Sequence, residues 1–400
     1  MVISKNKYDV VVLGAGASGI FCAGEIVSKS DKSVLVLDNG NQPLRKVKAS
    51  GGGRCNFTNV GATRDFYNSQ NGKFCISALK QFGPYDFVGM LLEKGISYTE
   101  KHKGQLFADG KSSAIIDFLM DRCGEKVSFK YSVEILSVDK VGDEFVIETL
   151  NGKFVADKVV VALGNKSFSK IGGTDFGAKL AENFGHSVVK LEPALVGFKS
   201  SVEDLRMFEC LAGTPVEVSV KVNGKRFEDS LLFTHRGISG PAPMQSSLFW
   251  KKGDSILVNF LPTIELFDYL KELKSEKPKL KLDKVLIELL PKKFVFRLME
   301  IFKIGNSDLA NCADKDFRLL GEFLNRWQYK PLDTMGFDTA EVSRGGVCVD
   351  EVASRTMESS LVKGLYFVGE VLDVTGCLGG YNLQWAWSSA FVCAKDIVSE

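Results

Sequence analysis

Residues 8–38 read YDVVVLGAGASGIFCAGEIVSKSDKSVLVLD. This pattern predicts an apolar strand over residues 8–13, a glycine motif, a helix, and a second strand over residues 34–37 that ends at Asp38. In such a βαβ unit, Gly14 allows the tight turn, Gly16 lets the backbone approach a pyrophosphate, and Gly19 brings helix and strand together. A carboxylate about 20 residues further on can accept hydrogen bonds from ribose hydroxyls. The stretch therefore predicts a dinucleotide-binding unit.

A second glycine-rich segment favours FAD over NAD. Residues 50–59 read SGGGRCNFTN and combine three glycines, a guanidinium and short polar side chains just after the ribose carboxylate. Backbone amides and Arg54 in such a segment suit a pyrophosphate or an isoalloxazine edge. A plain surface loop is the alternative.

The charge balance gives no electrostatic argument for nucleic-acid or membrane partners, because 51 basic and 49 acidic residues leave a net charge of +2. The lysine-rich run of residues 271–284 is interleaved with Glu272, Glu276 and Asp283, which predicts a solvated helix face or loop. No apolar stretch is long enough to span a bilayer, and the first strand begins by Tyr8. We therefore expect a cytoplasmic protein with a small-molecule substrate, no nucleic acid and no membrane partner. The oligomeric state stays open.

The nine cysteines contain no C-x-x-C pair and no zinc-like cluster, so reduced thiols and no metal site are expected. Cys55 lies close to the predicted cofactor but lacks a second cysteine a few residues away. We expect it to pack or to line the flavin, with a redox role as the alternative.

The pattern divides the chain into four parts. Residues 1–190 alternate strands and helices. They contain a helical stretch after the first βαβ unit, a hairpin turn at Asn151-Gly152, and an apolar strand that ends at Gly164. The glycine-dotted loop after that strand does not repeat the first motif, so no second nucleotide-binding unit is predicted.

The middle of the chain changes period twice. Residues 191–262 alternate apolar and polar in short strands, which predicts a small sheet or barrel, and residues 263–335 show helical spacing, as at Phe317, Leu320, Leu324 and Trp327. From Gly336 the chain is glycine-rich again, and residues 336–400 end in a loop and a helix. We predict an α/β fold in which the middle is inserted into the cofactor-binding domain.

Five motifs carry a resemblance to a known family: the opening glycine motif, residues 50–59, LFTHRGISGPA (232–242), EVSRGGVCVDEV (341–352) and the long segment 356–390. Together they resemble a bacterial FAD-dependent oxidoreductase family that includes aminoacetone oxidase and a flavoprotein of bile-acid dehydroxylation. The resemblance implies a glutathione-reductase-like FAD-binding Rossmann domain with an inserted β-domain and a small helical subdomain.

The resemblance also implies a set of cofactor-binding positions along the whole chain. They are Gly14, Gly16, Ala17, Ser18, Gly19, Asp38, Arg45, Lys46, Ser50, Gly51, Gly52, Gly53, Arg54, Asn56, Asn59, Val133, Ala162, Gly164, Gly369, Glu370, Asp373, Gly379, Gly380, Tyr381, Asn382, Leu383 and Gln384. The chain departs from the family pattern around the cofactor or its mouth, at Leu44, Gln105, Ala108 and Asn165.

Few residues are candidates for chemistry. His102 and His186 are predicted to be surface or capping histidines. His235 lies in a family motif and is the one candidate for a catalytic role, with a structural hydrogen-bonding role as the alternative. Glu370 and Asp373 are expected beside the cofactor, either to position it or to transfer protons.

The sequence thus predicts a cytosolic FAD-dependent oxidoreductase that transfers a hydride between flavin and a small organic substrate. The other electron partner stays open between NAD(P)H, oxygen and a quinone. Two alternatives remain: an oxygen-using amine oxidase of the aminoacetone oxidase type, and a flavin-bearing sensor or binding module without turnover.

Overall fold

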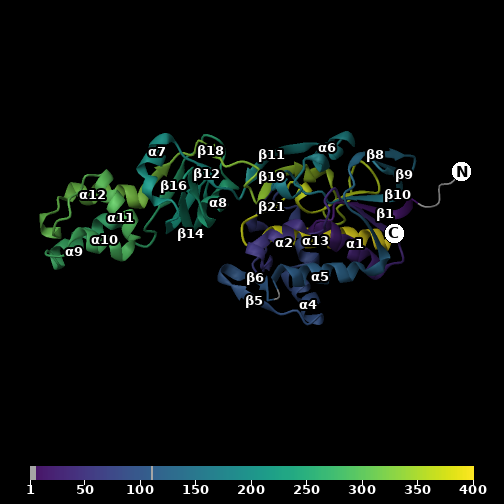
Figure 1. The fold of residues 1–400 in the computed structure, drawn as a ribbon, viewed down its shortest axis with the longest axis horizontal. Coiled ribbons are helices and arrows are strands. Elements are labelled where there is room, and N and C mark those ends of the chain that lie inside the picture. The colour runs from purple at the N-terminus through teal and green to yellow at the C-terminus, as the bar shows by residue number, and fades with distance from the viewer. Residues whose placement is uncertain (1–5, 110) are drawn as a thin grey trace. The chain divides into compact units, whose positions relative to one another are not determined.

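The computed structural model describes residues 6–109 and 111–400. Two compact units divide the chain: residues 1–192 with 342–400 form the first, and residues 193–341 form the second (Figure 1). In chain order, the second unit therefore interrupts the first. Within the described residues, no helix combines the length and the apolar character that a membrane crossing needs.

The first unit is built on a seven-stranded sheet with the Rossmann arrangement at its centre. Five strands pair in parallel and two antiparallel strands extend one side. The order is β7 (Val127–Lys130), β2 (Val34–Leu37), β1 (Lys7–Leu13), β10 (Gly152–Val161), β9 (Glu144–Thr149) and β8 (Ile135–Val141), with β20 (Leu365–Phe367) also paired to β10. Strand β2 and the carboxyl-terminal halves of β1 (10–13) and β10 (159–161) are fully buried, as expected for parallel strands that are covered on both faces.

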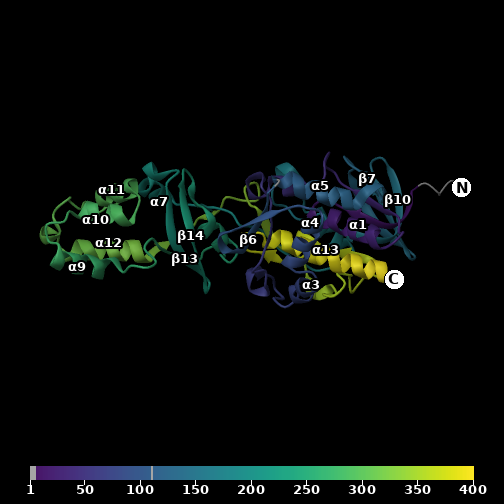
Figure 2. The same cartoon turned by 90° about the horizontal axis from the view of Figure 1, so that it is seen from below.

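Three helices pack together against this sheet: α1 (Ala17–Lys29), α5 (Lys111–Cys123) and α13 (Tyr381–Ser399), which lie side by side in both ribbon views (Figures 1 and 2). The Phe21 and Trp387 rings, 5.5 Å apart, join α1 to α13. On the other side of the sheet, α6 (Phe176–Asn183) approaches β10 through Gly177, where an added Cβ would lie 3.6 Å from Val161. The contact between α1 and α13 holds the last helix against the first one, next to the glycine turn.

Between β2 and α5 the chain is only partly helical. It contains α2 (Arg45–Ala49), α3 (Cys75–Gln81) and α4 (Pro84–Glu93), as predicted for a helical stretch. It also forms a three-stranded sheet that the sequence pattern did not predict, in the order β3 (Asn56–Asn59), β6 (Gln105–Ala108), β5 (Tyr98–Lys101). Two strand pairs complete the unit: β4 (Tyr67–Asn68) with β21 (Thr375–Gly376), and β11 (Val188–Ala194) with β19 (Val342–Val347).

The second unit has an antiparallel seven-stranded sheet, which is open and not a closed barrel over the described strands. Its order is β17 (Trp327–Tyr329), β16 (Ile256–Asn259), β13 (Pro215–Val222), β14 (Lys225–Thr234), β15 (Gly237–Ser239), β12 (Phe198–Lys199) and β18 (Asp333–Thr334). Two short helices flank it, α7 (Val202–Met207) and α8 (Pro241–Ser247).

The helices of the second unit are α9 (Leu266–Glu276), α10 (Leu282–Leu289), α11 (Lys292–Ile301) and α12 (Asp314–Arg326). The prediction that Trp327 continues the last helix is wrong, because the chain turns into β17 there and Trp327 pairs with Val258. Strands β17 and β18 thus lie in the range predicted to be helical. One continuous apolar core joins sheet and helices, with the Phe260 and Phe294 rings 5.0 Å apart.

Candidate cofactor site

In the turn between β1 and α1, neighbouring protein atoms leave room only for glycine at two positions. Gly14 has a φ of +107°, and a Cβ added there would lie 2.5 Å from the Ala162 carbonyl oxygen; one added at Gly19 would lie 2.0 Å from the Gly14 oxygen. Gly16 differs, because its φ of −82° suits any residue and its nearest neighbour would lie 4.0 Å away. The space above Gly16 is therefore left open by the protein, as a ligand that approaches the backbone requires.

Asp38 ties the end of β2 to this turn. Its Oδ2 accepts a hydrogen bond from the Ala15 amide (2.7 Å) and its Oδ1 accepts one from the Gly40 amide (2.6 Å). Arg45 Nη2 lies 3.4 Å from Oδ1, and the Val133 amide donates to the Asp38 carbonyl (3.0 Å). Each carboxylate oxygen keeps acceptor capacity beyond its backbone bond, so the group can still take ribose hydroxyls.

Glu370 is the centre of a polar cluster. Its Oε2 lies 3.1 Å from Lys46 Nζ, and its Oε1 accepts from Ser167 Oγ (2.8 Å) and from the Ser343 amide (3.0 Å). Lys46 also donates to Ser167 (3.0 Å). Asn165 donates to the Glu370 carbonyl. Lys46 and Glu370 are among the predicted positions, whereas the two serines are not. Ser343 lies in the family motif of residues 341–352, and Ser167 follows the predicted strand that ends at Gly164.

Gly369, which precedes Glu370 in the sequence, is held through its backbone by two side chains of α13. Its amide donates to Ser389 Oγ (3.0 Å), and its carbonyl accepts from Trp385 Nε1 (3.0 Å). A Cβ added at Gly369, which has a φ of +73°, would lie 2.5 Å from Ser18 Oγ. The glycine turn of α1, the end of β20 and helix α13 therefore meet here. Gly164, with a φ of +64°, lies next to the Glu370 carboxylate.

Asn59 joins three loops. Its Nδ2 donates to the carbonyl oxygens of Lys103 (3.0 Å) and Gly379 (2.9 Å), and its Oδ1 accepts from the Gly61 amide (2.9 Å). The segments around residues 60, 104 and 379 are therefore held close together on one side of the small β3-β6-β5 sheet.

The start of α13 is fixed to β3. Gln384 accepts a hydrogen bond from Thr58 Oγ1, and a Cβ added at Gly380, which has a φ of +97°, would lie 2.4 Å from the Thr58 carbonyl. Asn382 bonds to both the amide and the carbonyl of Gly376. The structure thus brings together two predicted groups that are far apart in sequence, residues 56–59 and 379–384. Tyr381 is buried and Leu383 is half-buried.

The segment of residues 50–54 is an exposed turn. Gly51, Gly52 and Gly53 all have positive φ, and no protein atom lies within 4 Å of a Cβ added at Gly52 or Gly53. Ser50 donates to the Val47 carbonyl (2.8 Å), and the exposed Arg54 guanidinium lies 5.8 Å from the centre of the Phe107 ring.

Cys55 follows this turn and is fully buried, with a φ of +52°. Burial raises the pKa of its thiol to about 11. All nine cysteines are free. A buried, protonated thiol without a disulfide partner has the character of a packing residue.

Two buried carboxamide oxygens, Asn56 Oδ1 and Asn165 Oδ1, have no hydrogen-bond partner among the described residues. Buried acceptors are normally satisfied, so both can receive donors from a bound molecule. Asp373 is also buried. Its Oδ2 accepts from the Gln70 amide (2.8 Å), and burial raises its pKa.

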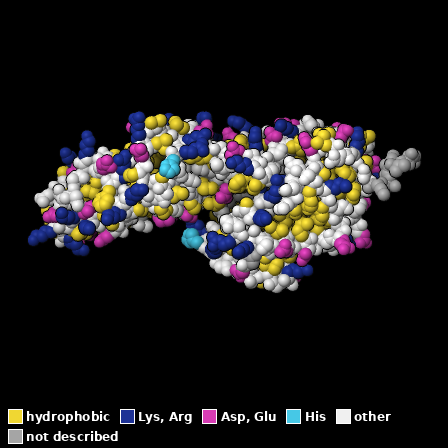
Figure 3. Space-filling model, viewed as in Figure 1, with side chains coloured by type: hydrophobic (Ala, Val, Ile, Leu, Met, Phe, Trp, Pro, Cys, Tyr) yellow, Lys and Arg dark blue, Asp and Glu magenta, His cyan; other side chains and the backbone are white. Residues whose placement is uncertain are grey.

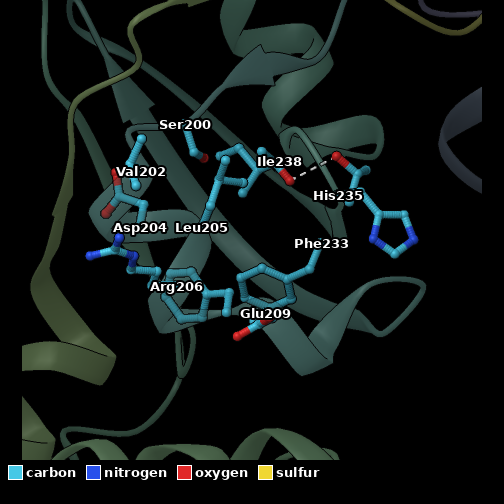
Figure 4. Close-up of a pocket in the computed structure, with 12 residues that line it drawn as sticks. Ser200, Val202, Asp204, Leu205, Arg206, Glu209, Phe233, His235 and Ile238 are labelled. Carbon is cyan, nitrogen blue, oxygen red and sulfur yellow. Dashed lines mark hydrogen bonds between the residues drawn. The ribbon is translucent and has the colours of Figure 1, made fainter.

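The three histidines have different settings. The prediction for His186 is wrong: its side chain is buried, with Nε2 2.7 Å from Ser359 Oγ and Nδ1 3.3 Å from Glu351 Oε2. His102 is exposed, as predicted. His235 is exposed at the turn between β14 and β15 of the second unit, and Figure 4 shows its imidazole pointing away from Phe233.

A cavity of about 200 Å³ lies beside that turn, lined by α7 and the ends of β14 and β15 (Figure 4). Its inner wall is apolar, with Phe208, Phe233 and Ile238. Of its charged residues, Arg206 and Glu209 are exposed and Asp204 is half-buried. It has no convergent set of buried titratable groups. Within residues 6–109 and 111–400, no group of three or more His, Cys, Asp or Glu side chains could hold a metal ion.

Comparison with known proteins gives a family and close relatives. Residues 8–396 match the family model described as HI0933-like protein Rossmann domain. A ribosomal RNA dihydrouridine synthase of Escherichia coli (strain K12) is 43% identical over 397 residues, which cover 98% of this chain and 99% of that protein. One of the same name from Haemophilus influenzae is 40% identical over 97% of this chain and 98% of that protein. A 3-dehydro-bile acid delta(4,6)-reductase of Clostridium scindens is 30% identical over 96% of this chain and 97% of that protein.

Proposed function

Because the chain belongs to the HI0933-like family of Rossmann-domain proteins, we propose that it is an FAD-dependent reductase that converts a uridine of ribosomal RNA to dihydrouridine. One observation carries the proposal: the 43% identity that extends over 98% of the chain to a protein named for that activity. The coarser prediction of an FAD-dependent oxidoreductase that transfers a hydride agrees with it.

The residues of the first unit fit FAD. The open space at Gly16 and the amides that begin α1 suit a pyrophosphate, and Asp38 suits the adenosine ribose. The unsatisfied oxygens of Asn56 and Asn165 are acceptors for ligand N–H and O–H groups. In this proposal Glu370 and Lys46 hold the segments that flank the cofactor, and Gly379–Gln384 close over it.

The names of the relatives point to one type of reaction. The C5=C6 bond of uridine is conjugated with the C4 carbonyl, and double bonds at positions 4 and 6 of a 3-oxo steroid are likewise conjugated with a carbonyl. Reduction of either adds a hydride to one carbon and a proton to the other, so a uridine takes up two electrons and two protons. Bound FAD would supply the hydride after reduction by a nicotinamide nucleotide.

This chain's residues contribute binding, orientation and exclusion of water. The carboxylate of Glu370 is held by three donors, which fixes the loop after β20 in one position. Asp373 and Cys55 are both buried groups whose raised pKa favours the protonated form.

The proposal replaces the expectation of a small-molecule substrate and no nucleic acid. That expectation rested on the net charge of +2, and a balanced total does not exclude a local basic surface.

The test uses the purified, FAD-loaded protein with NADPH or NADH under anaerobic conditions. Ribosomal RNA from cells that lack the protein would be incubated with it, digested to nucleosides and analysed by mass spectrometry. We expect dihydrouridine, two hydrogens heavier than uridine, only when reductant and enzyme are both present. A 3-oxo steroid with double bonds at positions 4 and 6 serves as the comparison substrate. Reduction of the steroid without any dihydrouridine in the RNA would overturn the assignment.

A further inference from the structure

The hairpin of β5 and β6 carries cations next to the candidate cofactor site. Residues 98–104 contain Lys101, His102 and Lys103 against the single acidic residue Glu100. Glu100 and Lys101 are neighbours in β5, so their side chains leave opposite faces of the strand. Lys101 is half-buried, and His102 and Lys103 are exposed. Figure 3 shows Lys and Arg side chains gathered over this part of the first unit, beside a histidine.

Two of the nearby cations share one aromatic ring. Lys101 Nζ lies 4.2 Å from the centre of the Phe107 ring, and the Arg54 guanidinium lies 5.8 Å from it. No described carboxylate forms an ion pair with either cation. Two like charges near one ring repel each other, and a bound anion would relieve that repulsion. A phosphate is such an anion.

An aromatic platform lies near by. Phe66 stacks on Tyr381 with ring centres 4.6 Å apart and an interplanar angle of 12°. Tyr381 is buried behind it, while 39% of Phe66 is exposed. The backbone of Phe66 is fixed, because its carbonyl accepts from the Cys377 amide (2.8 Å). One face of the phenyl ring is therefore supported by protein and part of the ring faces solvent, as in the stacking platforms of proteins that bind single-stranded nucleic acid.

Asn59 brings the cations and the platform to the same place. Its side chain bonds to the Lys103 carbonyl on one side and to the Gly61 amide on the other, and Gly61 opens the segment that leads to Phe66. A Cβ added at Gly61 would lie 3.9 Å from the Tyr381 hydroxyl. The predicted cofactor residues Asn59 and Gly379 lie at the centre of this arrangement.

From this juxtaposition we propose that residues 61–66 and 101–103 form the docking surface for single-stranded RNA. One base stacks on Phe66, and the phosphates on either side of it meet Lys101, Lys103 and the outer edge of Arg54. The inference rests on the proposed function, because it states how that substrate is held beside the cofactor. It requires an unpaired segment, since a base within a duplex cannot reach an aromatic face.

The experiment measures binding of a uridine-containing single-stranded RNA oligonucleotide, and of the same sequence as a duplex, over a series of salt concentrations. The variant Lys101→Gln/Lys103→Gln removes two phosphate contacts. We expect it to weaken single-strand binding and to lower the salt slope by roughly 1.4, at about 0.7 for each phosphate contact. Phe66→Leu keeps the apolar contact with Tyr381 but removes the stacking face, so it should weaken binding roughly tenfold with an unchanged salt slope. Phe66→Tyr should retain binding.

The matched control is Lys277→Gln/Lys279→Gln, which makes the same charge change at two exposed lysines of the second unit. It should bind like the wild type, and all variants should keep their FAD content and unfolding temperature. Three results would each overturn the proposed docking surface. They are equal losses of affinity in the two double-lysine variants, tighter binding of the duplex than of the single strand, and wild-type affinity in Lys101→Gln/Lys103→Gln. A different result separates the two proposals. If the variants lose binding as predicted but the wild type forms no dihydrouridine, the docking surface is supported and the proposed activity is overturned.

Discussion

Lys46 Nζ lies 3.1 Å from Glu370 Oε2, although 324 positions separate the two residues in the sequence. Both side chains are partly shielded, with 34% and 20% of their surface exposed. The same carboxylate accepts from Ser167 and from the Ser343 amide. One side chain therefore connects four segments, two of which precede the second unit in the chain and two of which follow it.

Glu370→Ala should lower the free energy of unfolding by about 1–3 kcal/mol, because it leaves the Ser343 amide without its acceptor and removes the ion pair with Lys46. Glu370→Gln keeps an acceptor oxygen and should lose less. Urea denaturation of the FAD-free protein measures both changes. Identical denaturation midpoints for Glu370→Ala and the wild type would show that the cluster does not stabilise the fold.

Two glycines of the turn should respond differently to the same substitution. Gly14→Ala places a Cβ 2.5 Å from the Ala162 oxygen at a φ of +107°, so we expect clear destabilisation. Gly16→Ala meets no protein atom closer than 4.0 Å and should leave the unfolding temperature of the FAD-free protein unchanged. It should still weaken FAD at least about tenfold, because the pyrophosphate needs that space. Calorimetry and flavin fluorescence separate the two effects, and full FAD affinity in Gly16→Ala would contradict the predicted position of the pyrophosphate.

Asp38→Ala should weaken FAD by about 1–3 kcal/mol, since it removes charge-assisted bonds to the ribose. It also removes the acceptor of the Ala15 and Gly40 amides, so the FAD-free protein should lose stability as well. Asp38→Asn keeps one acceptor oxygen and is the comparison. Denatured wild-type protein should release FAD and not FMN, as chromatography of the supernatant will show. Unchanged FAD affinity in Asp38→Ala would argue against the assigned role.

The glycine turn could be predicted from the sequence, because Gly14 and Gly19 are required by local backbone geometry that the glycine motif indicates. The sequence pattern also predicted that Asp38 follows the second strand and that the chain ends in a helix. Two partners of Glu370, Ser167 and Ser343, could not be predicted, since they are ordinary serines that become significant only through contacts between distant segments.

Two errors have a common physical origin. Trp327 fits the helical spacing of Phe317, Leu320 and Leu324, yet pairing with Val258 in the sheet determines its conformation. His186 follows a helix in a polar context that suggested exposure, but packing of the 349–359 segment buries it. In both cases tertiary contacts outweighed the local pattern.

Burial of His186 predicts a pH dependence of stability. Burial lowers its pKa from about 6.5, and the nearby Glu351 carboxylate acts in the opposite direction without reversing the shift. The unfolded chain therefore binds this proton more readily than the folded protein. The contribution to stability is complete above about pH 6.5 and is lost as the pH falls below it. Between pH 7.5 and 5.5 the free energy of unfolding should drop more in the wild type than in His186→Gln. His102→Gln, which changes an exposed histidine, should follow the wild type.

Cys55 is predicted to be unreactive and dispensable for electron transfer. Its thiol is fully buried, and its pKa of about 11 keeps it protonated at neutral pH, whereas the thiolate is the reactive form. Iodoacetamide should therefore label the exposed Cys210 well before Cys55, and peptide mass spectrometry can follow both sites. Cys55→Ser should retain FAD and reduce within about tenfold of the wild-type rate, which is roughly 1.4 kcal/mol of barrier. Cys55→Gly tests the backbone, because glycine adopts the φ of +52° without strain. Loss of flavin reduction in both variants, with FAD still bound, would mean that the thiol takes part in the reaction.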